Sequence, residues 1–135
     1  MRIVLMTLFL TLSVFAAPLK WSLNFDSALE RATAEHKPLL LYITQAGCGT
    51  CRYMEENVFV DKEIREYMDA HYVYVKLYLG DKSVPANLEP FATPTFYILN
   101  HDRSEVTDAV LGGKNSENFL MFLEEGVDYY QIKNR

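Results

Sequence analysis

The stretch KPLLLYITQAGCGTCRYM, residues 37–54, decides the fold. After a proline it has an unbroken apolar run at residues 39–43. Such a run is typical of a strand buried on both faces, in a sheet with helices on either side. Gln45, Ala46 and Gly47 then form a turn, and two cysteines open the segment that follows.

Three polar residues mark the starts of helices. Asp26, Asp61 and Asn115 are each followed by apolar residues at helical spacing, so each is expected to cap a helix. The first of these helices is expected over residues 27–36. Residues 128–135 are mostly polar and either extend the last helix or fray.

Three further strands are expected. Residues 72–79 alternate between aliphatic and mainly tyrosine side chains. The tyrosine face is expected to pack beneath a helix, with its hydroxyls at the rim, and the alternative is an interaction surface. Residues 95–99 and 106–111 form a hairpin through a turn at residues 100–103, and residues 80–90 form a loop with one helical turn.

The order of these elements predicts an α/β fold. The strand–helix–strand that begins at residue 39 suits a parallel crossover, and the hairpin near residue 100 requires antiparallel pairing. A mixed sheet with helices on both faces follows. The length of 135 residues is that of one domain.

The charge balance limits the partners. The chain has 13 Lys and Arg against 18 Asp and Glu, a net charge of −5 at pH 7. Without a basic stripe to neutralise phosphates, no nucleic-acid partner is expected. Two cysteines are also too few for a disulfide-stapled scaffold or for a zinc site built on cysteine alone.

Residues 1–17 are predicted to be a secretory signal peptide. A basic second residue precedes an uncharged run, residues 3–17, that is shorter than the roughly 20 residues of a membrane-spanning helix. Small residues at its end favour cleavage after Ala16 or Ala17, which leaves residues 18–135 as one domain. The alternatives are an uncleaved anchor and a buried strand. A signal peptide with so little beyond one basic residue and an apolar run is typical of bacteria and indicates the periplasm, where disulfides form.

The only two cysteines, Cys48 and Cys51, follow the buried strand and open a helix. Cys48 is expected at or near the N-cap, where free backbone N–H groups stabilise a thiolate. Cys51 lies one turn on, on the same face and more enclosed. Gly49 lets the backbone approach closely. An exposed thiolate backed by a second thiol is what thiol–disulfide exchange needs.

Other roles for the cysteine pair compete with exchange. A tetrahedral zinc site needs two more ligands, and His36, His71 and His101 are scattered without paired spacing. A copper site would use a nearby soft ligand such as Met54, but one methionine on a helix is more often core. A c-type haem needs histidine directly after the second cysteine, where Arg52 stands. A structural disulfide across so short a loop stabilises little.

A second feature, Thr93-Pro94, stands directly before the strand at residues 95–99. Proline cannot donate to a sheet, so it belongs at the start of a strand. A cis peptide bond is compatible with this position. The plainer alternative is a trans proline that only begins the strand.

Together these segments resemble the thioredoxin superfamily. The similarity covers residues 21–125, and within the superfamily it is to secreted bacterial thioredoxin-like proteins, including the C-terminal domain of the periplasmic reductant transporter DsbD. The similarity to that branch lies in residues 51–59 and the Asp61 and Ile64 that follow. The matching segments are the signal peptide, residues 37–43 before Cys48-Gly49-Thr50-Cys51, Thr93-Pro94-Thr95, and Gly112-Gly113 before the last helix.

The resemblance implies a thioredoxin fold, with a central mixed sheet of four to five strands, and a role for each matching residue. Cys48 matches the attacking thiol and Cys51 the resolving thiol. Pro94 matches the cis-proline that faces the disulfide. Thr93, before it, lends backbone hydrogen bonds to a bound substrate peptide. No metal or other cofactor is implied.

The chain departs from thioredoxin around the cysteines. Gly47 and Thr50 stand where thioredoxin has Trp and Pro. Tyr42 stands where thioredoxin has a buried Asp that relays protons. Glu55 or Glu56, one turn past the second cysteine, is a candidate to replace that Asp, and the alternative is a solvated helix face.

The predicted function is that of a periplasmic thiol–disulfide oxidoreductase, a reductase of protein disulfides that cycles Cys48 and Cys51 between dithiol and disulfide. The dipeptide that shapes the motif, Gly49-Thr50, lacks the His of the oxidant DsbA, which favours the reducing direction. The expected partners are disulfide-containing or dithiol proteins and a membrane thiol-reductant donor, and a monomer is expected. The alternatives are a non-catalytic peptide- or metal-binding module on this fold, and an oxidase or isomerase.

Overall fold

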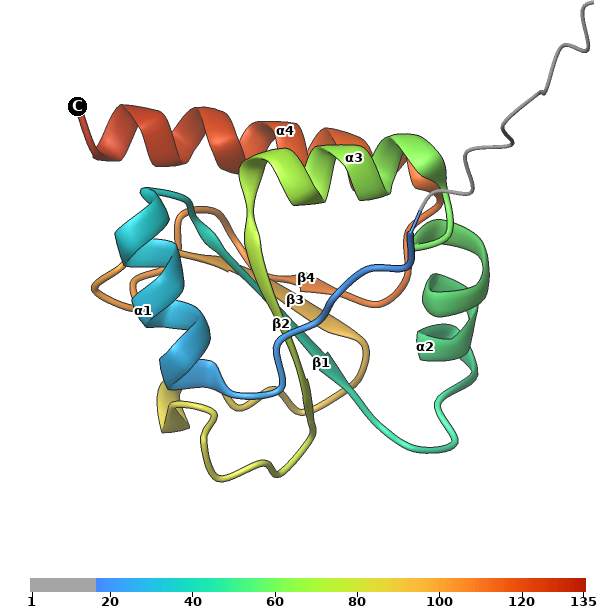
Figure 1. Cartoon of the computed structure of the whole chain (residues 1–135). Coiled ribbons are helices and arrows are strands. Elements are labelled where there is room, and N and C mark those ends of the chain that lie inside the picture. The colour runs from blue at the N-terminus through green and yellow to red at the C-terminus, as the bar shows by residue number, and fades with distance from the viewer. Residues whose placement is uncertain (1–16) are drawn as a thin grey trace, which may run out of the picture.

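A four-stranded sheet lies at the centre of the molecule (Figure 1). The computed structural model describes residues 17–135, so the predicted signal peptide lies outside the described residues except for Ala17. The strands stand in the order β2-β1-β3-β4, with β1 and β2 parallel and the other pairs antiparallel. Their bounds are Leu39–Thr44 (β1), Val73–Tyr78 (β2), Thr95–Leu99 (β3) and Val110–Leu111 (β4). The predicted mixed sheet is therefore confirmed.

Helices cover both faces of this sheet (Figure 1). On one face lies α1, and α2, α3 and α4 lie on the other, each group with its own apolar cluster. No helix of residues 17–135 is long and apolar enough to cross a membrane. The helical bounds are Phe25–Glu35 (α1), Gly49–Tyr53 (α2), a π-helical turn at Met54–Val58 (η1), Lys62–His71 (α3), a 3-10 turn at Ala86–Leu88 (η2) and Ser116–Lys133 (α4).

The central strand β1 is buried along its whole length, as its unbroken apolar sequence predicts. Leu40 and Tyr42 face the cluster beneath α2, α3 and α4, and Leu39, Leu41 and Ile43 face the cluster beneath α1. Each of these five side chains is 0 % exposed. Burying a large apolar side chain contributes about 2 kcal/mol, so this strand anchors both layers.

The tyrosine face of β2 packs beneath helices, as predicted. Tyr72 is buried and its hydroxyl donates to the carbonyl of Leu123 in α4 at 2.6 Å. Tyr74 is also buried, and its hydroxyl donates to the carboxylate of Asp69 in α3 at 2.6 Å. Only Tyr78, at the carboxyl end of the strand, is exposed.

The first helix begins earlier than predicted. Asn24, and not Asp26, is its N-cap, because the Asn24 side chain accepts a hydrogen bond from the backbone N–H of Ser27 at 2.9 Å. Asn and Asp cap helices about equally well. Burial favours Asn24, because a helix capped there includes Phe25 in its first turn, and the side chain of Phe25 is 0 % exposed. The caps predicted at Asp61 and Asn115 are confirmed.

The strand predicted at residues 106–111 is wrong over most of its length, because only Val110–Leu111 forms β4. Leu99 bridges to Glu105, and Phe96 pairs with Val110. Leu99 and Phe96 are three residues apart on β3, whereas their partners on the other segment are five residues apart. Two extra residues on that segment therefore do not pair with β3. The intervening residues include Asp108, a poor strand former. Residues 128–133, left open by the sequence, extend α4.

Candidate active site

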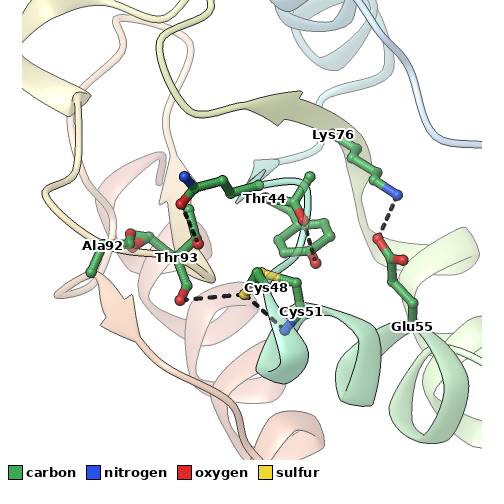
Figure 2. Close-up of a disulfide and its surroundings, with 10 residues drawn as sticks. Thr44, Cys48, Cys51, Glu55, Lys76, Ala92 and Thr93 are labelled. Carbon is green, nitrogen blue, oxygen red and sulfur yellow. Dashed lines mark hydrogen bonds and ion pairs between the residues drawn. A yellow bond between two sulfur atoms is a disulfide. The ribbon is translucent and has the colours of Figure 1, made fainter.

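The two cysteines lie where the carboxyl end of β1 meets the amino end of β3. The turn after β1 leads into α2, and the loop before β3 passes beside it (Figure 2). A third segment closes the group, because the backbone N–H of Gly112, just after β4, donates to the carbonyl of Pro94 at 2.8 Å. Three segments far apart in the sequence thus surround Cys48 and Cys51.

Cys48 caps α2, as predicted. Its Sγ atom accepts a hydrogen bond from the backbone N–H of Cys51 at 3.1 Å. The two residues are joined by a disulfide, with their Cα atoms 5.3 Å apart. Cys48 is partly exposed, whereas Cys51 is only 2 % exposed. One sulfur is therefore accessible to a partner, and the other is enclosed behind it.

The Thr93-Pro94 segment faces this disulfide (Figure 2). The carbonyl oxygen of Thr93 lies 3.6 Å from Cys48 Sγ, and the peptide bond between Thr93 and Pro94 is cis. The Thr93 hydroxyl donates to the side-chain oxygen of Gln45 at 3.4 Å, which ties the loop to the turn after β1. The structure thus brings Cys48 and Cys51 together with Thr93 and Pro94, four of the residues that the sequence singled out.

The two residues between the cysteines have different surroundings. No atom lies within 4 Å of where a Cβ at Gly49 would stand, so the surface beside Cys48 is open there. A Cβ at Gly113 would lie 2.7 Å from Thr50 Cγ2. Gly113 is therefore the glycine that allows a close approach to α2, although the sequence indicated only a break in structure at that position.

A small cavity of about 260 Å³ adjoins the disulfide. Both cysteines line it, together with polar groups that include Thr44, Glu55 and Tyr78. A polar cavity of this size is large enough for water. It therefore connects the enclosed Cys51 with a carboxylate.

Glu55 is held in place by Lys76 of β2 (Figure 2). The two side chains form an ion pair at 2.5 Å, and they are only 38 % and 22 % exposed. Glu56 is exposed and does not line the cavity. The structure therefore singles out Glu55 of the two candidate carboxylates. Lys76 was not among the residues predicted for the site, although a lysine between tyrosines on the inward face of a strand was a usable signal.

Tyr42 lies in the core close to this ion pair. The Lys76 ammonium is 5.9 Å from the centre of its ring, and its hydroxyl donates to Thr44 Oγ1 at 3.2 Å. Burial raises the pKa of Tyr42 to about 12, and the nearby Glu55 carboxylate acts in the same direction. The phenol therefore stays neutral at physiological pH, so it cannot replace a carboxylate as a base.

Within residues 17–135, no three His, Cys, Asp or Glu side chains come together as a metal site would require.

A comparison with family models matches residues 7–91 to Thioredox_DsbH, a family described as "Protein of unknown function, DUF255". The matched segment includes β1, both cysteines and β2. No sequence among the curated proteins matches the chain significantly.

Solved structures share the fold. A structure described as DsbH oxidoreductase has a TM-score of 0.68 at 17 % identity, over 86 % of this chain and 89 % of its own. The oxidised C-terminal domain of Neisseria meningitidis DsbD has a TM-score of 0.63 at 18 % identity, over 75 % and 91 %. A thioredoxin from Thermus thermophilus has a TM-score of 0.68 at 21 % identity, over 81 % and 87 %. These likenesses confirm the thioredoxin fold.

Proposed function

Because the chain belongs to the Thioredox_DsbH family of thioredoxin-like proteins, we propose that it is a thiol–disulfide oxidoreductase that reduces protein disulfides through Cys48 and Cys51. One observation carries the proposal. The partly exposed Cys48 sulfur caps a helix and receives the Cys51 N–H, while Cys51 stays enclosed behind it. The same N–H and the start of the helix stabilise a thiolate on Cys48 once the disulfide is reduced.

The reaction begins from the dithiol form. The Cys48 thiolate attacks one sulfur of a partner disulfide, so that a Cys48–partner disulfide forms and the partner's own S–S bond breaks. The released partner sulfur takes up a proton and becomes a thiol. Thr93 supports this step, because its backbone lies beside the reacting sulfur and offers hydrogen bonds to an extended partner chain. Pro94 presents that backbone at the start of β3.

The second step requires Cys51 to lose a proton. In this chain Glu55 accepts it through the cavity that adjoins the disulfide, with Lys76 holding the carboxylate in position. The Cys51 thiolate then attacks Cys48 Sγ, so that the Cys48–Cys51 disulfide forms and the Cys48–partner bond breaks. The departing partner thiolate takes up a proton, and the partner leaves as a dithiol. Two electrons have passed from the protein to the partner.

The proposed direction is reduction, and the proposed compartment is the periplasm after cleavage of the signal peptide. The uncharged dipeptide Gly49-Thr50 adds no cationic side chain next to Cys48 that would further stabilise its thiolate. A very strongly stabilised thiolate makes a cysteine pair a strong oxidant. The lack of this additional stabilisation at Cys48 therefore favours a reductant. A membrane thiol donor returns the disulfide to the dithiol after each cycle.

The reduction potential of the pair tests the direction. The protein lacking residues 1–17 is equilibrated in graded dithiothreitol or glutathione buffers, quenched with acid and alkylated, and the free thiols are counted. A value near or below about −220 mV supports a reductase. A value near about −120 mV, as in DsbA, would make the protein an oxidant and contradict the proposed direction.

A further inference from the structure

Thr44 is a polar residue at the end of the apolar strand β1, and it is only 3 % exposed. A buried hydroxyl costs free energy unless it forms hydrogen bonds. Within residues 17–135, the Thr44 hydroxyl has one hydrogen-bond partner, the phenol of Tyr42 at 3.2 Å. Because a hydroxyl can donate one hydrogen bond and accept two, Thr44 can bind a second partner as well.

The reactive cysteines lie next to Thr44. Its side chain lines the same cavity as Cys48 and Cys51, and Figure 2 shows it beside the disulfide. In the disulfide, the Cys51 sulfur carries no proton. Once the pair is reduced, Cys51 has a thiol that can donate to the Thr44 oxygen, and a thiolate there can accept from the Thr44 hydroxyl. The enclosed sulfur is therefore a suitable second partner for Thr44.

Tyr42 joins Thr44 to Glu55. The Lys76 ammonium, which pairs with Glu55, is 5.9 Å from the centre of the Tyr42 ring. Burial is the main cause that raises the pKa of Tyr42 to about 12, the hydrogen bond with Thr44 lowers this pKa, and the charge of Glu55 and a hydrogen bond with it raise it. A group that accepts the phenol proton favours the neutral phenol, and a group that donates to the phenol oxygen favours the phenolate.

The three side chains therefore form a chain from Thr44 through Tyr42 to Glu55. A hydroxyl hydrogen rotates about its C–O bond, so either oxygen of the Tyr42–Thr44 pair can be the donor. A chain of hydroxyls that can exchange these roles can pass a proton from one end to the other.

The charged and titratable groups around this chain favour Glu55 as the group that accepts the proton. Arg52 and Glu55 line the cavity from the helical segment after the cysteines, and Tyr78 lines it from β2. Lys76, also on β2, pairs with Glu55. Glu55 is the one carboxylate among the residues that line this cavity. Arg52 follows Cys51 directly in the chain, and its positive charge favours a thiolate on that sulfur.

We propose that Thr44 and Tyr42 form a hydroxyl relay that carries the Cys51 proton to Glu55. The inference rests on the proposed function and specifies the route of its second step. The Cys51 thiol gives its proton to the Thr44 oxygen, Thr44 gives its own to the Tyr42 oxygen, and Tyr42 gives its own to the Glu55 carboxylate. Each hydroxyl gains one proton and loses one, so both stay neutral. The negative charge moves from Glu55 to the Cys51 sulfur, and no electron is transferred until that sulfur attacks Cys48.

The test follows a single turnover with a short peptide that is closed by one disulfide. The peptide is mixed in excess with the reduced protein, samples are quenched with acid, and the protein–peptide adduct is counted by mass spectrometry. The rise of the adduct reports the attack by Cys48, and its decay reports the step in which Cys51 loses its proton.

Three variants interrupt or preserve the relay. Thr44→Val keeps the size of the side chain and removes the hydroxyl, Thr44→Ser keeps the hydroxyl, and Tyr42→Phe removes the phenol. Tyr74→Phe is the matched control. Tyr74 is also buried and its hydroxyl donates to Asp69, but it does not line the cavity.

At pH 6 to 7, Thr44→Val and Tyr42→Phe should each slow the decay of the adduct about tenfold, because water replaces a lost relay hydroxyl only in part. Formation of the adduct should be unchanged in both variants. Thr44→Ser and Tyr74→Phe should resemble the wild type in both steps. The rate of decay in Thr44→Val should approach that of the wild type as the pH rises, because hydroxide then takes the Cys51 proton directly. In a Glu55→Gln background, Thr44→Val should slow the decay no further, since both residues serve one route.

Decay at the wild-type rate in Thr44→Val or in Tyr42→Phe would overturn the relay and leave the proposed function standing. So would a Thr44→Ser variant as slow as Thr44→Val, because a packing role would then explain both. Further slowing by Thr44→Val in the Glu55→Gln background would also overturn the relay. If the wild type yields neither the adduct nor the reduced peptide, the proposed function fails and the relay fails with it.

Discussion

The carboxylate of Glu55 lies 2.5 Å from the ammonium of Lys76, and the same carboxylate lines the cavity that reaches Cys51. The relationship joins the helical segment after the cysteines to the middle of β2. It supplies a carboxylate near the enclosed thiol even though β1 carries Tyr42 where thioredoxin has its buried Asp. If Glu55 is the base, changing it should affect only the step in which Cys51 loses its proton.

Glu55→Gln should therefore slow the release of the partner from the mixed disulfide by about 100-fold at pH 6 to 7. Without the carboxylate, deprotonation depends on hydroxide, so the rate in the variant should rise about tenfold per pH unit while the wild type changes less. Rapid quenching of a single turnover, with the mixed disulfide separated from product, measures this step. The control is Glu56→Gln, at an exposed neighbour, and an equal effect of the two substitutions would argue against a base at Glu55.

Replacing the enclosed thiol should stop the cycle halfway. Cys51→Ser leaves Cys48 able to attack a partner but removes the thiol that releases it, so covalent adducts should accumulate in cells. Non-reducing electrophoresis and mass spectrometry would identify them. Cys48→Ser should yield no adducts, because Cys51 is only 2 % exposed. If adducts formed equally through Cys51, the assigned roles would have to be exchanged.

Gly113 should resist substitution because of Thr50. A Cβ at this position would lie 2.7 Å from Thr50 Cγ2, so Gly113→Ala should lower the free energy of unfolding by about 1 kcal/mol. Urea unfolding of the oxidised protein measures the loss. Thr50→Ser removes Cγ2, so the double variant should regain most of it. Gly49→Ala is the control, since its Cβ would meet nothing within 4 Å, and a loss there as large as at Gly113 would contradict the packing argument.

Tyr42 should make the fold sensitive to alkaline pH. Burial raises its pKa to about 12 from the ordinary value of 10. The neutral phenol therefore contributes stability that is fully present below pH 10 and is lost as the pH rises towards 12, by an amount of about 2 to 3 kcal/mol. At pH 8, Tyr42→Phe should have a free energy of unfolding about 1 kcal/mol below that of the wild type, because it lacks the hydrogen bond to Thr44. Between pH 10 and 12, the free energy of unfolding should fall less in the variant than in the wild type. Urea unfolding across that range compares the two slopes, and identical slopes would show that Tyr42 does not titrate there.

Local pattern was sufficient for β1, β2 and β3 and for most helix caps, but not for β4. The first strand was predicted at residues 39–43 and β1 is one residue longer, and β3 occupies the predicted residues 95–99. Capping at Cys48, Asp61 and Asn115 also agrees, because an N-cap depends on a side chain and the next few backbone N–H groups. The start of α1 was missed, since Asn24 and Asp26 are equivalent caps until Phe25 is buried.

The sequence by itself determined the alternation of elements, the cysteine pair at a helix start and the proline before β3, because each is encoded within a few neighbouring residues. Only the tertiary structure decided which distant groups meet. Glu55 acquires its partner because β2 places Lys76 beside β1, and Thr50 meets Gly113 because β4 returns beside Pro94. The packing of helices and loops against the paired strands brings together residues more than 20 positions apart in the chain, as with Glu55 and Lys76, and no local spacing records such contacts.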